Sequence, residues 1–402
     1  MKKLLFFVLV VVLAITARKK DDPEPIMAQE VILDKTTLTL EVGDSGLLRA
    51  TVLPTNADDK TIRWVSSNSD VVRLDHLTGM FTALMPGTCT IRAATNGVFA
   101  ECEITVTYKT VVGGGYGYLN WKLLQDGTFI VSGEGAMPSR EWEDYILQIK
   151  RVIINDGVIS IGDYAFHNCV NLSDIIISNS VTNIGKYAFY GTSLAGVTIP
   201  NSVTNIGEYT FSHCYDLTRL TISAANIGEG AFGNCESLAN IIISDGVTNI
   251  GEYAFFGCRG LTDVTISNSV TNIGDHAFEN CGILSDIIIP NSVTNIGDYA
   301  FSNCNLSDVI IHEGVKYIGE YAFYGLNISS LTIPNSVTSI GLNAFSGWNL
   351  TSVIIMATIP PMIGVENFLC DDDTLYVPKG CVDLYKADAA WNSAFTTITE
   401  QP

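Results

Sequence analysis

One unit recurs nine times between residues 151 and 356 and limits what this chain can fold into. Each copy carries an Ile-Gly pair and a phenylalanine four residues after the glycine, as in IPNSVTNIGEYTFSHC, which runs from Ile199 to Cys214. Successive phenylalanines are 21 to 23 residues apart, and they are Phe166, Phe189, Phe211, Phe232, Phe255, Phe278, Phe301, Phe323 and Phe345. A period this short and regular predicts a solenoid, in which each coil rests on the next.

Within one coil, the order of residue types predicts which side chains point inward. Val197, Thr198 and Ile199 alternate as in a short strand, with the two aliphatic residues inward and the threonine outward. Pro200 ends this strand, because proline cannot donate to a ladder. The chain then turns back, and we expect the Ile-Gly pair and the phenylalanine to face the interior. A single coil cannot bury these residues, so stacking at roughly 4.8 Å must bury them as one column.

The repeats resemble a known class. The strings GVISIGDYAFHNCVNLSDIIIS and SVTNIGEYAFFGCRGLTDVTIS are similar to the BspA-like leucine-rich repeat, and the resemblance covers about residues 151–356. It implies a right-handed coil stack with a parallel sheet on one face, in exported bacterial proteins that attach to host or microbial surfaces. The expected fold class is therefore mostly β, with a capped leucine-rich-repeat solenoid.

Residues 30–108 predict a separate all-β domain. Short alternating runs such as VILDKTTLTLEVGD and GVFAECEITVTY are parted by turn signals, as in a small sandwich. The segment resembles the group 2 bacterial immunoglobulin-like domain through Gly43, Pro54, WVSSNSDVV from Trp64, PGTCTI from Pro86 and the final ITVTY. The resemblance implies an immunoglobulin-like β-sandwich that acts as a spacer or adhesion module.

The N-terminal segment predicts export. Residues 1–17 have the charged start and short apolar run of a secretory signal peptide, and residues 18–29 form a charged, Pro-rich tether. LAITARKKDDPEP resembles the end of a bacterial lipoprotein signal, but Arg18 stands where the lipidated cysteine would be, which argues against lipid anchoring. The alternative is cleavage after Ala17, although Ile15 fits the small-residue rule poorly. We expect an exported protein, on the cell surface or secreted, that meets a membrane only through an N-terminal anchor.

The segments on either side of the repeats predict end caps, which a solenoid needs to cover its open core. Residues 109–150 comprise a glycine run, Gly113–Gly115, which we interpret as a short flexible joint, and a hairpin that turns at Asp126-Gly127. Residues 357–402 resemble the closing segment of BspA-like proteins. The residues that carry this resemblance are Pro360, Pro361, Tyr376, Val377, Pro378, Tyr385 and Trp391.

Six of the ten cysteines fall three residues after a repeat phenylalanine. They are Cys169, Cys214, Cys235, Cys258, Cys281 and Cys304. Thr192, Leu326 and Trp348 take the same position in other coils, so this position does not require sulfur. Buried free thiols are therefore expected there, since the short clustered spacings of a zinc site are absent.

The remaining cysteines form two pairs. Across the turn at Asn96-Gly97, Cys89 should face Ile104 and Cys102 should face Ile91. The diagonal separation of about 7–8 Å exceeds what a disulfide spans, so two buried thiols are expected. Cys370 and Cys381 are the one pair that the sequence offers for a disulfide, and the sequence leaves open whether that bond forms.

Composition and motifs argue against several functions. The 402 residues include 42 acids and 22 bases, and a net charge of −20 repels nucleic acid and anionic membranes. No nucleotide-binding or zinc-hydrolase motif occurs, and no histidine stands in a recurring nucleophile context. Asp371–Asp373 lack the alternating spacing of a calcium loop. We therefore expect no enzyme, no cofactor and no metal.

Two ladders remain as candidate ligand-binding surfaces. The first comprises outward strand residues and their polar neighbours, namely Asp174, Ile176, Thr198, Arg219, Thr221, Ile242, Asp263, Thr265, Asp286, Ile288, Asp308 and Ile310. Repeat duplication and β-propensity alone remain an alternative explanation. The second comprises Tyr164, Tyr187, Tyr209, Tyr253, Tyr299 and Tyr321, which either cradle a ligand or stack on one another over the outer turn.

These features predict a monomeric, noncovalent binding protein. We expect it to recognise an extracellular protein or glycan, on a host or neighbouring cell, through many weak contacts along the repeat face. A glycan-capture accessory protein is one alternative, and sugar affinity centred on the tyrosines would mark it. A structural spacer is another, and it predicts no saturable binding.

Overall fold

The computed structural model describes residues 24–402 apart from 225, 327, 348–349, 365–366 and 369–373, and it does not describe the side chain of Asp308. The predicted signal peptide and the first part of the tether therefore lie outside the described residues. So do Cys370, which leaves its pairing with Cys381 a prediction, and Asp371–Asp373. The chain forms two compact units, with the boundary between Lys109 and Thr110.

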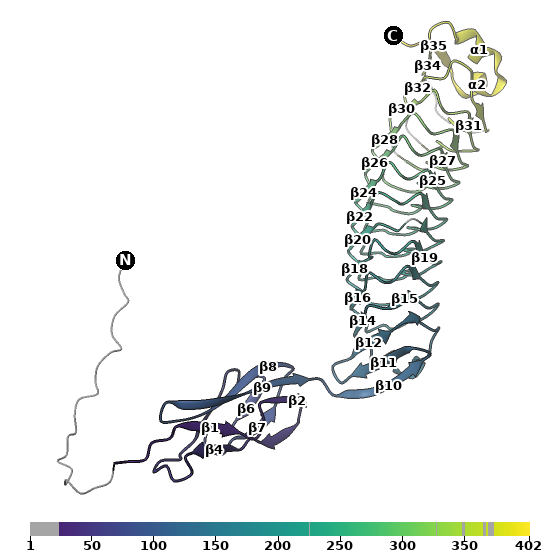
Figure 1. Ribbon diagram of the computed structural model, residues 1–402. Helices are drawn as coiled ribbons and strands as arrows, with labels where there is room; N and C mark the ends of the chain where they lie inside the picture. The colour runs from purple at the N-terminus through teal and green to yellow at the C-terminus, as the bar shows by residue number, and fades with distance from the viewer. Residues whose placement is uncertain (1–23, 225, 327, 348–349, 365–366, 369–373) are drawn as a thin grey trace, which may run out of the picture. The chain divides into compact units, whose positions relative to one another are not determined.

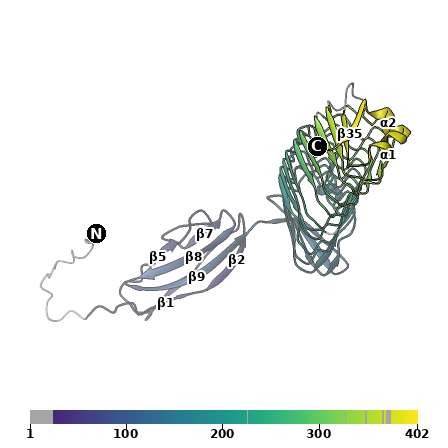
Figure 2. The same cartoon turned by 90° about the horizontal axis from the view of Figure 1, so that it is seen from above.

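The N-terminal unit is the expected immunoglobulin-like sandwich. A four-stranded sheet of order β2-β9-β8-β5, seen in Figure 2, shares a core with the three-stranded sheet β3-β7-β6, and β1 pairs with β4. Trp64 and Ile91 from the larger sheet pack in this core with Phe81 from the smaller one. The strands are β1(Glu30–Leu33), β2(Thr37–Glu41), β3(Ser45–Leu47), β4(Ala50–Leu53), β5(Arg63–Ser66), β6(Val72–Leu74), β7(Met80–Ala83), β8(Gly87–Thr95) and β9(Val98–Thr107).

The two cysteines of the sandwich lie as predicted. In the β8–β9 register, Cys89 pairs with Ile104 and Ile91 pairs with Cys102. Both thiols are free and buried, and burial raises the pKa of each. They therefore contribute to the core as small apolar side chains.

The C-terminal unit is a solenoid whose coils carry parallel strands on two sides (Figure 1). Short strands form one continuous 11-stranded sheet. These are β13(Gly135–Ala136), β15(Val158–Ile161), β17(Asn183–Ile184), β19(Asn205–Ile206), β21(Asn226–Ile227), β23(Asn249–Ile250), β25(Asn272–Ile273), β27(Asn295–Ile296), β29(Tyr317–Ile318), β31(Ser339–Ile340) and β33(Met362–Ile363). The resemblance implied a sheet on one face, and the short Asn-Ile strands add a second.

The other side of the coils carries longer strands. They group into sheets of order β10-β11-β12-β14-β16, β18-β20-β22-β24, β26-β28 and β30-β32-β34-β35. The first three strands belong to the N-terminal cap and are β10(Thr110–Tyr116), β11(Leu119–Leu124) and β12(Thr128–Gly133). Those of the coils are β14(Arg151–Ile154), β16(Asp174–Ile177), β18(Gly196–Thr198), β20(Arg219–Ile222), β22(Asn240–Ile243), β24(Asp263–Ile266), β26(Asp286–Ile289), β28(Asp308–Ile311), β30(Ser330–Ile333), β32(Ser352–Ile355), β34(Thr374–Val377) and β35(Thr397–Glu400). We name this side the long-strand face.

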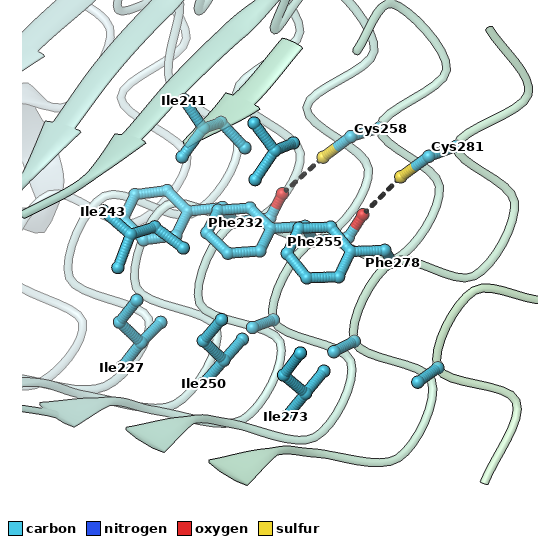
Figure 3. Close-up of a cluster of buried hydrophobic side chains, with 14 of the residues drawn as sticks. Ile227, Phe232, Ile241, Ile243, Ile250, Phe255, Cys258, Ile273, Phe278 and Cys281 are labelled. Carbon is cyan, nitrogen blue, oxygen red and sulfur yellow. Dashed lines mark hydrogen bonds between the residues drawn. The ribbon is translucent and has the colours of Figure 1, made fainter. Parts of the chain in front are cut away.

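Between the two sides, the predicted inward residues form columns. The repeat phenylalanines are buried and stack with ring centroids 5.1 to 5.6 Å apart. Figure 3 shows Phe232, Phe255 and Phe278 in this column above a row of isoleucines from the short strands. Each coil thus completes the core of its neighbour, which is why the sequence repeats its apolar positions so strictly.

The six repeat cysteines are free and buried, as predicted. Each of five thiols donates to the carbonyl oxygen of a phenylalanine one coil back, for example Cys258 Sγ to Phe232 O at 3.3 Å (Figure 3). Burial raises the pKa of Cys169 and Cys258 to about 12 and that of Cys214 to about 11. The thiols therefore act as small core residues that also satisfy a buried carbonyl.

The glycine of each Ile-Gly pair is required because neighbouring coils approach closely there. A Cβ atom on Gly207 would stand 2.7 Å from Lys186 N and 2.8 Å from Gly185 C. A Cβ on Gly251 would stand 2.5 Å from Ile227 O. Any larger residue would push the coils apart, because real Cβ atoms do not come this close to backbone atoms.

The N-terminal cap differs from its prediction at the glycine run. The expected hairpin is present as β11(Leu119–Leu124) and β12(Thr128–Gly133), with η1(Glu143–Tyr145) beyond it. Gly113–Gly115, however, form no joint but lie inside a further strand, β10(Thr110–Tyr116), paired antiparallel with β11. A Cβ on Gly114 would stand 2.9 Å from Trp121 Nε1, so the missing side chains let β10 pass over the indole.

The C-terminal cap begins later than predicted. The sequence pattern predicts the boundary at residue 356, yet β33 joins the short-strand sheet and Phe368 stacks on Phe345 at 5.7 Å. The helices α1(Val382–Ala387) and α2(Ala389–Ala394) follow, at the end of the stack (Figure 1). Asp388 caps α2 by accepting from the amides of Ala390 and Trp391. The buried Trp391 donates to Pro361 O at 2.8 Å and so ties the helix to the last coil.

Candidate binding surfaces of the solenoid

The long-strand face carries the first predicted ladder. Ile176, Ile242, Ile288 and Ile310 are 44 to 59% exposed, and Thr198, Thr221 and Thr265 are exposed between them along the chain. The parallel register aligns these residues across strands, with Ile242 between Thr221 and Thr265 and with Ile288 beside Ile310. They form an outward row, as the alternation of residue types predicted.

A polar row runs beside it. Arg219, Asp263 and Asp286 are exposed, whereas Asp174 is half-buried and pairs with Arg151 at 2.6 Å. The side chain of Asp308 lies outside the described set. The face thus sets an aliphatic and threonine row next to a mainly acidic row, and ligand binding by these residues stays a prediction.

The predicted tyrosine ladder forms two stacks along the outer turn. One stack is Tyr164, Tyr187 and Tyr209, with ring centroids 5.0 and 5.2 Å apart. The other is Tyr253, His276, Tyr299 and Tyr321, with centroids 4.4, 4.8 and 4.7 Å apart. Because the rings cover one another's faces, the interior of each stack offers edges and hydroxyls. This is the mutual stacking that the sequence left open as an alternative.

Each aromatic residue of this ladder, which we call a rung, has a left-handed backbone conformation. The φ angles lie between 51 and 58° at Tyr164, Tyr187, Tyr209, Tyr253, His276, Tyr299 and Tyr321. Residues other than glycine rarely adopt this conformation, which costs about 1–3 kcal/mol. Stacking offsets part of that cost, and so do hydrogen bonds between coils such as Tyr187 N to Glu208 O at 2.9 Å. The sequence gives no signal of this conformation, because glycine and asparagine, not tyrosine, are the residues that usually mark a left-handed position.

Gly230 takes the rung position between the two stacks. Its φ of 58° matches the other rungs, so the backbone keeps its path while the ring is missing. Beside it lies an open pocket of about 140 Å³, lined by Tyr209, Ser212, His213, Gly230, Gly233, Asn234, Tyr253 and Phe256. We name this pocket the Gly230 slot. Sequence reasoning missed it, although the change from Glu-Tyr to Glu-Gly in IGEGAF marks it.

A ladder of asparagines also went unpredicted. On the short-strand side, each side-chain Nδ2 donates to the Oδ1 of the asparagine one coil back, at 2.7 to 3.4 Å. The members are Asn183, Asn205, Asn226, Asn249, Asn272 and Asn295. An open groove of about 460 Å³ runs beside the first three, with Asp163, Lys186, Glu208 and Glu229 on its wall. The recurring Thr-Asn-Ile-Gly string is the signal that could have found this ladder.

One contact resembles a catalytic pair. Ser212 Oγ lies 2.9 Å from His213 Nδ1, the spacing of a serine nucleophile and its base. Ser212 is only 1% exposed, and its hydroxyl also donates to Gly233 O at 2.9 Å. Because this hydroxyl is engaged by both His213 and Gly233 O, the contact serves the turn.

Within the described ranges, no helix is long and apolar enough to cross a membrane. The same residues contain no cluster of three or more histidine, cysteine, aspartate or glutamate side chains that could hold a metal ion.

Comparison with protein families gives two matches. Residues 143–262 and 248–368 match the family described as the BspA type leucine rich repeat region, and residues 27–106 match the bacterial Ig-like domain of group 2. An uncharacterized protein of Clostridium acetobutylicum is 33% identical over 90 residues. That match covers 22% of this chain and 9% of the other protein, so it spans only a small part of that relative.

Similar solved structures come from several bacteria. A leucine-rich repeat protein of Eubacterium ventriosum is 24% identical, with a TM-score of 0.45, over 72% of this chain and 84% of the other. The T. pallidum leucine rich repeat protein is 25% identical, with a TM-score of 0.36, over 42% and 90%. A leucine rich cell surface protein of Faecalibacterium prausnitzii is 20% identical, with a TM-score of 0.29, over 61% and 95%.

Proposed function

Because this chain belongs to the BspA-type leucine-rich repeat proteins, we propose that it is an exported cell-surface protein that recognises a host or microbial protein or glycan through the long-strand face. Proteins of this family are typically found on the cell surface or secreted and are typically not enzymes. Recognition is noncovalent and sums many weak contacts along a rigid surface.

One observation carries this proposal. Ile242, Ile288 and Ile310 hold 44 to 59% of their surface in water. Threonine occupies the equivalent position in other coils, as at Thr221 and Thr265, so the fold does not need an aliphatic residue there. Leaving apolar surface in water forgoes roughly 25 cal/mol per Å² that burial against a partner would recover. The row is therefore suited to contact another molecule.

The experiment probes an array of glycans and extracellular-matrix proteins with the full chain and with the triple variant Ile242→Glu, Ile288→Glu, Ile310→Glu. Saturable binding by the unaltered chain and its loss in the variant are expected, because three carboxylates cannot be buried against the same partner. Far-UV circular dichroism verifies that the variant keeps its fold.

The chain offers a matched control. Val170, Tyr215 and Ile283 are 48 to 51% exposed, and they lie in the turn that follows the repeat cysteine. Their replacement by glutamate adds the same charge elsewhere on the coil, and binding should persist. Equal loss in both variants would point to net charge alone and contradict recognition by the long-strand face, and no saturable binding at all would favour a spacer.

A further inference from the structure

The Gly230 slot interrupts an otherwise aromatic ladder. From Tyr164 to Tyr321, all the equivalent positions except Gly230 are occupied by a tyrosine or a histidine. The ring of Tyr209 lies against Gly230, because a Cβ atom on Gly230 would stand 2.3 Å from Tyr209 Cε1. Its ring is tilted by 20° from that of Tyr187, compared with 2° between Tyr187 and Tyr164. The stack thus ends in an aromatic ring on each side of a gap.

The size of the slot suits one small planar group. Its volume of about 140 Å³ is close to the roughly 150 Å³ of an engineered cavity that holds a benzene ring. Tyr209 and Tyr253 supply the aromatic walls, Phe256 adds a third ring, and Gly230 leaves the floor without a side chain. A flat group entering here would take the place of the missing rung.

The electrostatics of the slot favour a cation. Glu229 accepts a hydrogen bond from the Tyr209 hydroxyl at 2.5 Å, and this bond raises the pKa of that phenol. Burial raises the pKa of Tyr253, and the carboxylates of Glu252, Glu279 and Glu229 raise it further. These carboxylates therefore act on the aromatic rings that flank the gap, and the whole chain carries a net charge of −20.

The ladder already contains a planar group of the kind that could bind in the slot. His276 fills the rung position two coils further on, with its imidazole flat between Tyr253 and Tyr299 at interplanar angles of 7° and 6°. Its Nδ1 lies 2.5 Å from Glu279 Oε2. A planar nitrogen-bearing group stacked between phenols and bonded to a carboxylate is therefore a rung that this architecture already accepts.

We propose that the Gly230 slot binds the guanidinium group of an arginine side chain on a partner polypeptide. A guanidinium is planar and always charged, stacks on aromatic faces, and carries several N–H donors for a carboxylate such as Glu229, which is bonded to the Tyr209 hydroxyl at the slot. A lysine ammonium lacks the plane, and a neutral sugar lacks the charge. This site is separate from the long-strand face and does not depend on whether that face binds.

The test titrates the full chain with N-acetyl-arginine amide at pH 7.5 and follows binding by calorimetry and by the tyrosine ring signals in NMR. At this pH His213, whose pKa is lowered by burial, is neutral and does not repel the probe. We expect saturable binding with a dissociation constant of about 1 mM, as for a single weak contact. The uncharged isostere N-acetyl-citrulline amide and N-acetyl-lysine amide should each bind about tenfold more weakly. Free arginine is titrated in parallel, and tighter binding of the free amino acid than of the capped form would assign the slot to free arginine and overturn a polypeptide source.

Two variants test the assignment independently. Gly230→Tyr restores the missing rung in a backbone conformation that Tyr209 and Tyr253 already adopt, with φ of 51 and 54°. It displaces the Tyr209 ring, which now lies against Gly230, and should abolish binding because the new ring fills the slot. The double variant Glu229→Gln, Glu252→Gln adds no bulk, and should bring arginine and citrulline to equal affinity. Glu141→Gln with Asp144→Asn removes two exposed charges from the N-terminal cap and should leave binding unchanged.

Several outcomes would overturn the proposal. They are unchanged arginine binding in a folded Gly230→Tyr protein, an arginine preference that survives the double glutamine variant, and no saturation of the unaltered chain at about 20 mM probe. Saturable binding of a neutral methyl glycoside, lost in Gly230→Tyr while capped arginine fails to bind, would assign the slot to a sugar instead.

Discussion

At the scale of single residues, the solenoid uses side chains for their shape more than for their reactivity. Cys258 shows this most clearly, because its thiol is fully buried and donates to Phe232 O. Burial raises the pKa of Cys258 to about 12, so at pH 8 the thiol is almost entirely un-ionised. A residue type associated with redox and metal chemistry serves here as a packing group.

We predict that Cys258 resists alkylation in the native protein. Iodoacetamide at pH 8 should leave its peptide unmodified for hours, because the reactive thiolate is both rare and inaccessible. The same reagent in denaturant should modify it completely, and peptide mapping by mass spectrometry reads both results. Rapid labelling of the folded chain would contradict the buried-thiol assignment.

The left-handed rungs give a second prediction at this scale. Tyr299 has a φ of 57° and stacks on His276 and Tyr321. Tyr299→Ala loses both stacking contacts but keeps the backbone strain, whereas Tyr299→Gly loses the contacts and relieves the strain. The glycine variant should therefore be more stable than the alanine variant by about 1 kcal/mol, the reverse of their order in a helix.

Urea unfolding of the two variants measures this difference. Ala254→Gly, in a buried position with ordinary backbone angles, is the control, and there glycine should be the less stable residue. A Tyr299→Ala protein as stable as Tyr299→Gly would show that the rung is not strained.

At the scale of elements, the short strands depend on the asparagine ladder. Asn249 donates to Asn226 Oδ1 at 3.4 Å and accepts from Asn272 Nδ2 at 2.7 Å, so it takes part in two bonds of the ladder. Asn183 stands at the end of the ladder and accepts from Asn205 at 3.0 Å. Interior and terminal asparagines of the ladder should therefore contribute unequally to the free energy of unfolding.

We predict that Asn249→Ala lowers the free energy of unfolding by about 1–2 kcal/mol and Asn183→Ala by about half as much, since each hydrogen bond of the ladder contributes about 0.5–1.5 kcal/mol. Chemical unfolding followed by circular dichroism measures both. The Asn249→Ala, Asn272→Ala pair should be less destabilising than the sum of its single variants, because the two residues share one bond. Equal effects of Asn183→Ala and Asn249→Ala would contradict the ladder.

The sequence predicts those features that repeat at the period of the coils, and it does not predict those that depend on contacts between segments. The Phe column, the cysteine positions and the outward isoleucines repeat at a fixed period, and the structure places each as expected. The rung backbone and the Gly113–Gly115 strand depend on close approach between segments, which no local pattern reports. The prediction that residues 357–402 form the cap leaves out the tenth coil, although Phe368 follows Gly364 at the repeat spacing.

At the scale of the whole molecule, the repeat explains why the candidate sites are hard to predict. Duplication places the same residue types on every coil, so a pattern alone cannot separate a binding row from an inherited one. What distinguishes the Gly230 slot is a departure from the repeat, namely a glycine among tyrosines. In a solenoid, irregular positions therefore point to specific function more directly than regular ones do.

The whole molecule should also lose stability in acid through two histidines. Burial lowers the pKa of His167 and His213 below the usual value, with Arg140 adding to the effect at His167 and Glu236 opposing it at His213. The unfolded chain then binds protons at a higher pH than the folded chain. The stability that these groups contribute is present above about pH 6.5, the unfolded value, and is lost as the pH falls through the lower folded values.

We predict that the free energy of unfolding falls between pH 7.5 and pH 5, and that the fall is smaller in a variant carrying His167→Tyr and His213→Asn. These replacements suit their positions, because Tyr190 and Asn234 occupy the equivalent places in other coils. Asn234 also shares the left-handed backbone of His213, with φ angles of 58 and 60°. Guanidinium unfolding at the two pH values, with His76→Asn in the sandwich as a control that leaves the solenoid unchanged, isolates the effect. A pH dependence identical in the unaltered chain and the double variant would assign the acid sensitivity to other groups.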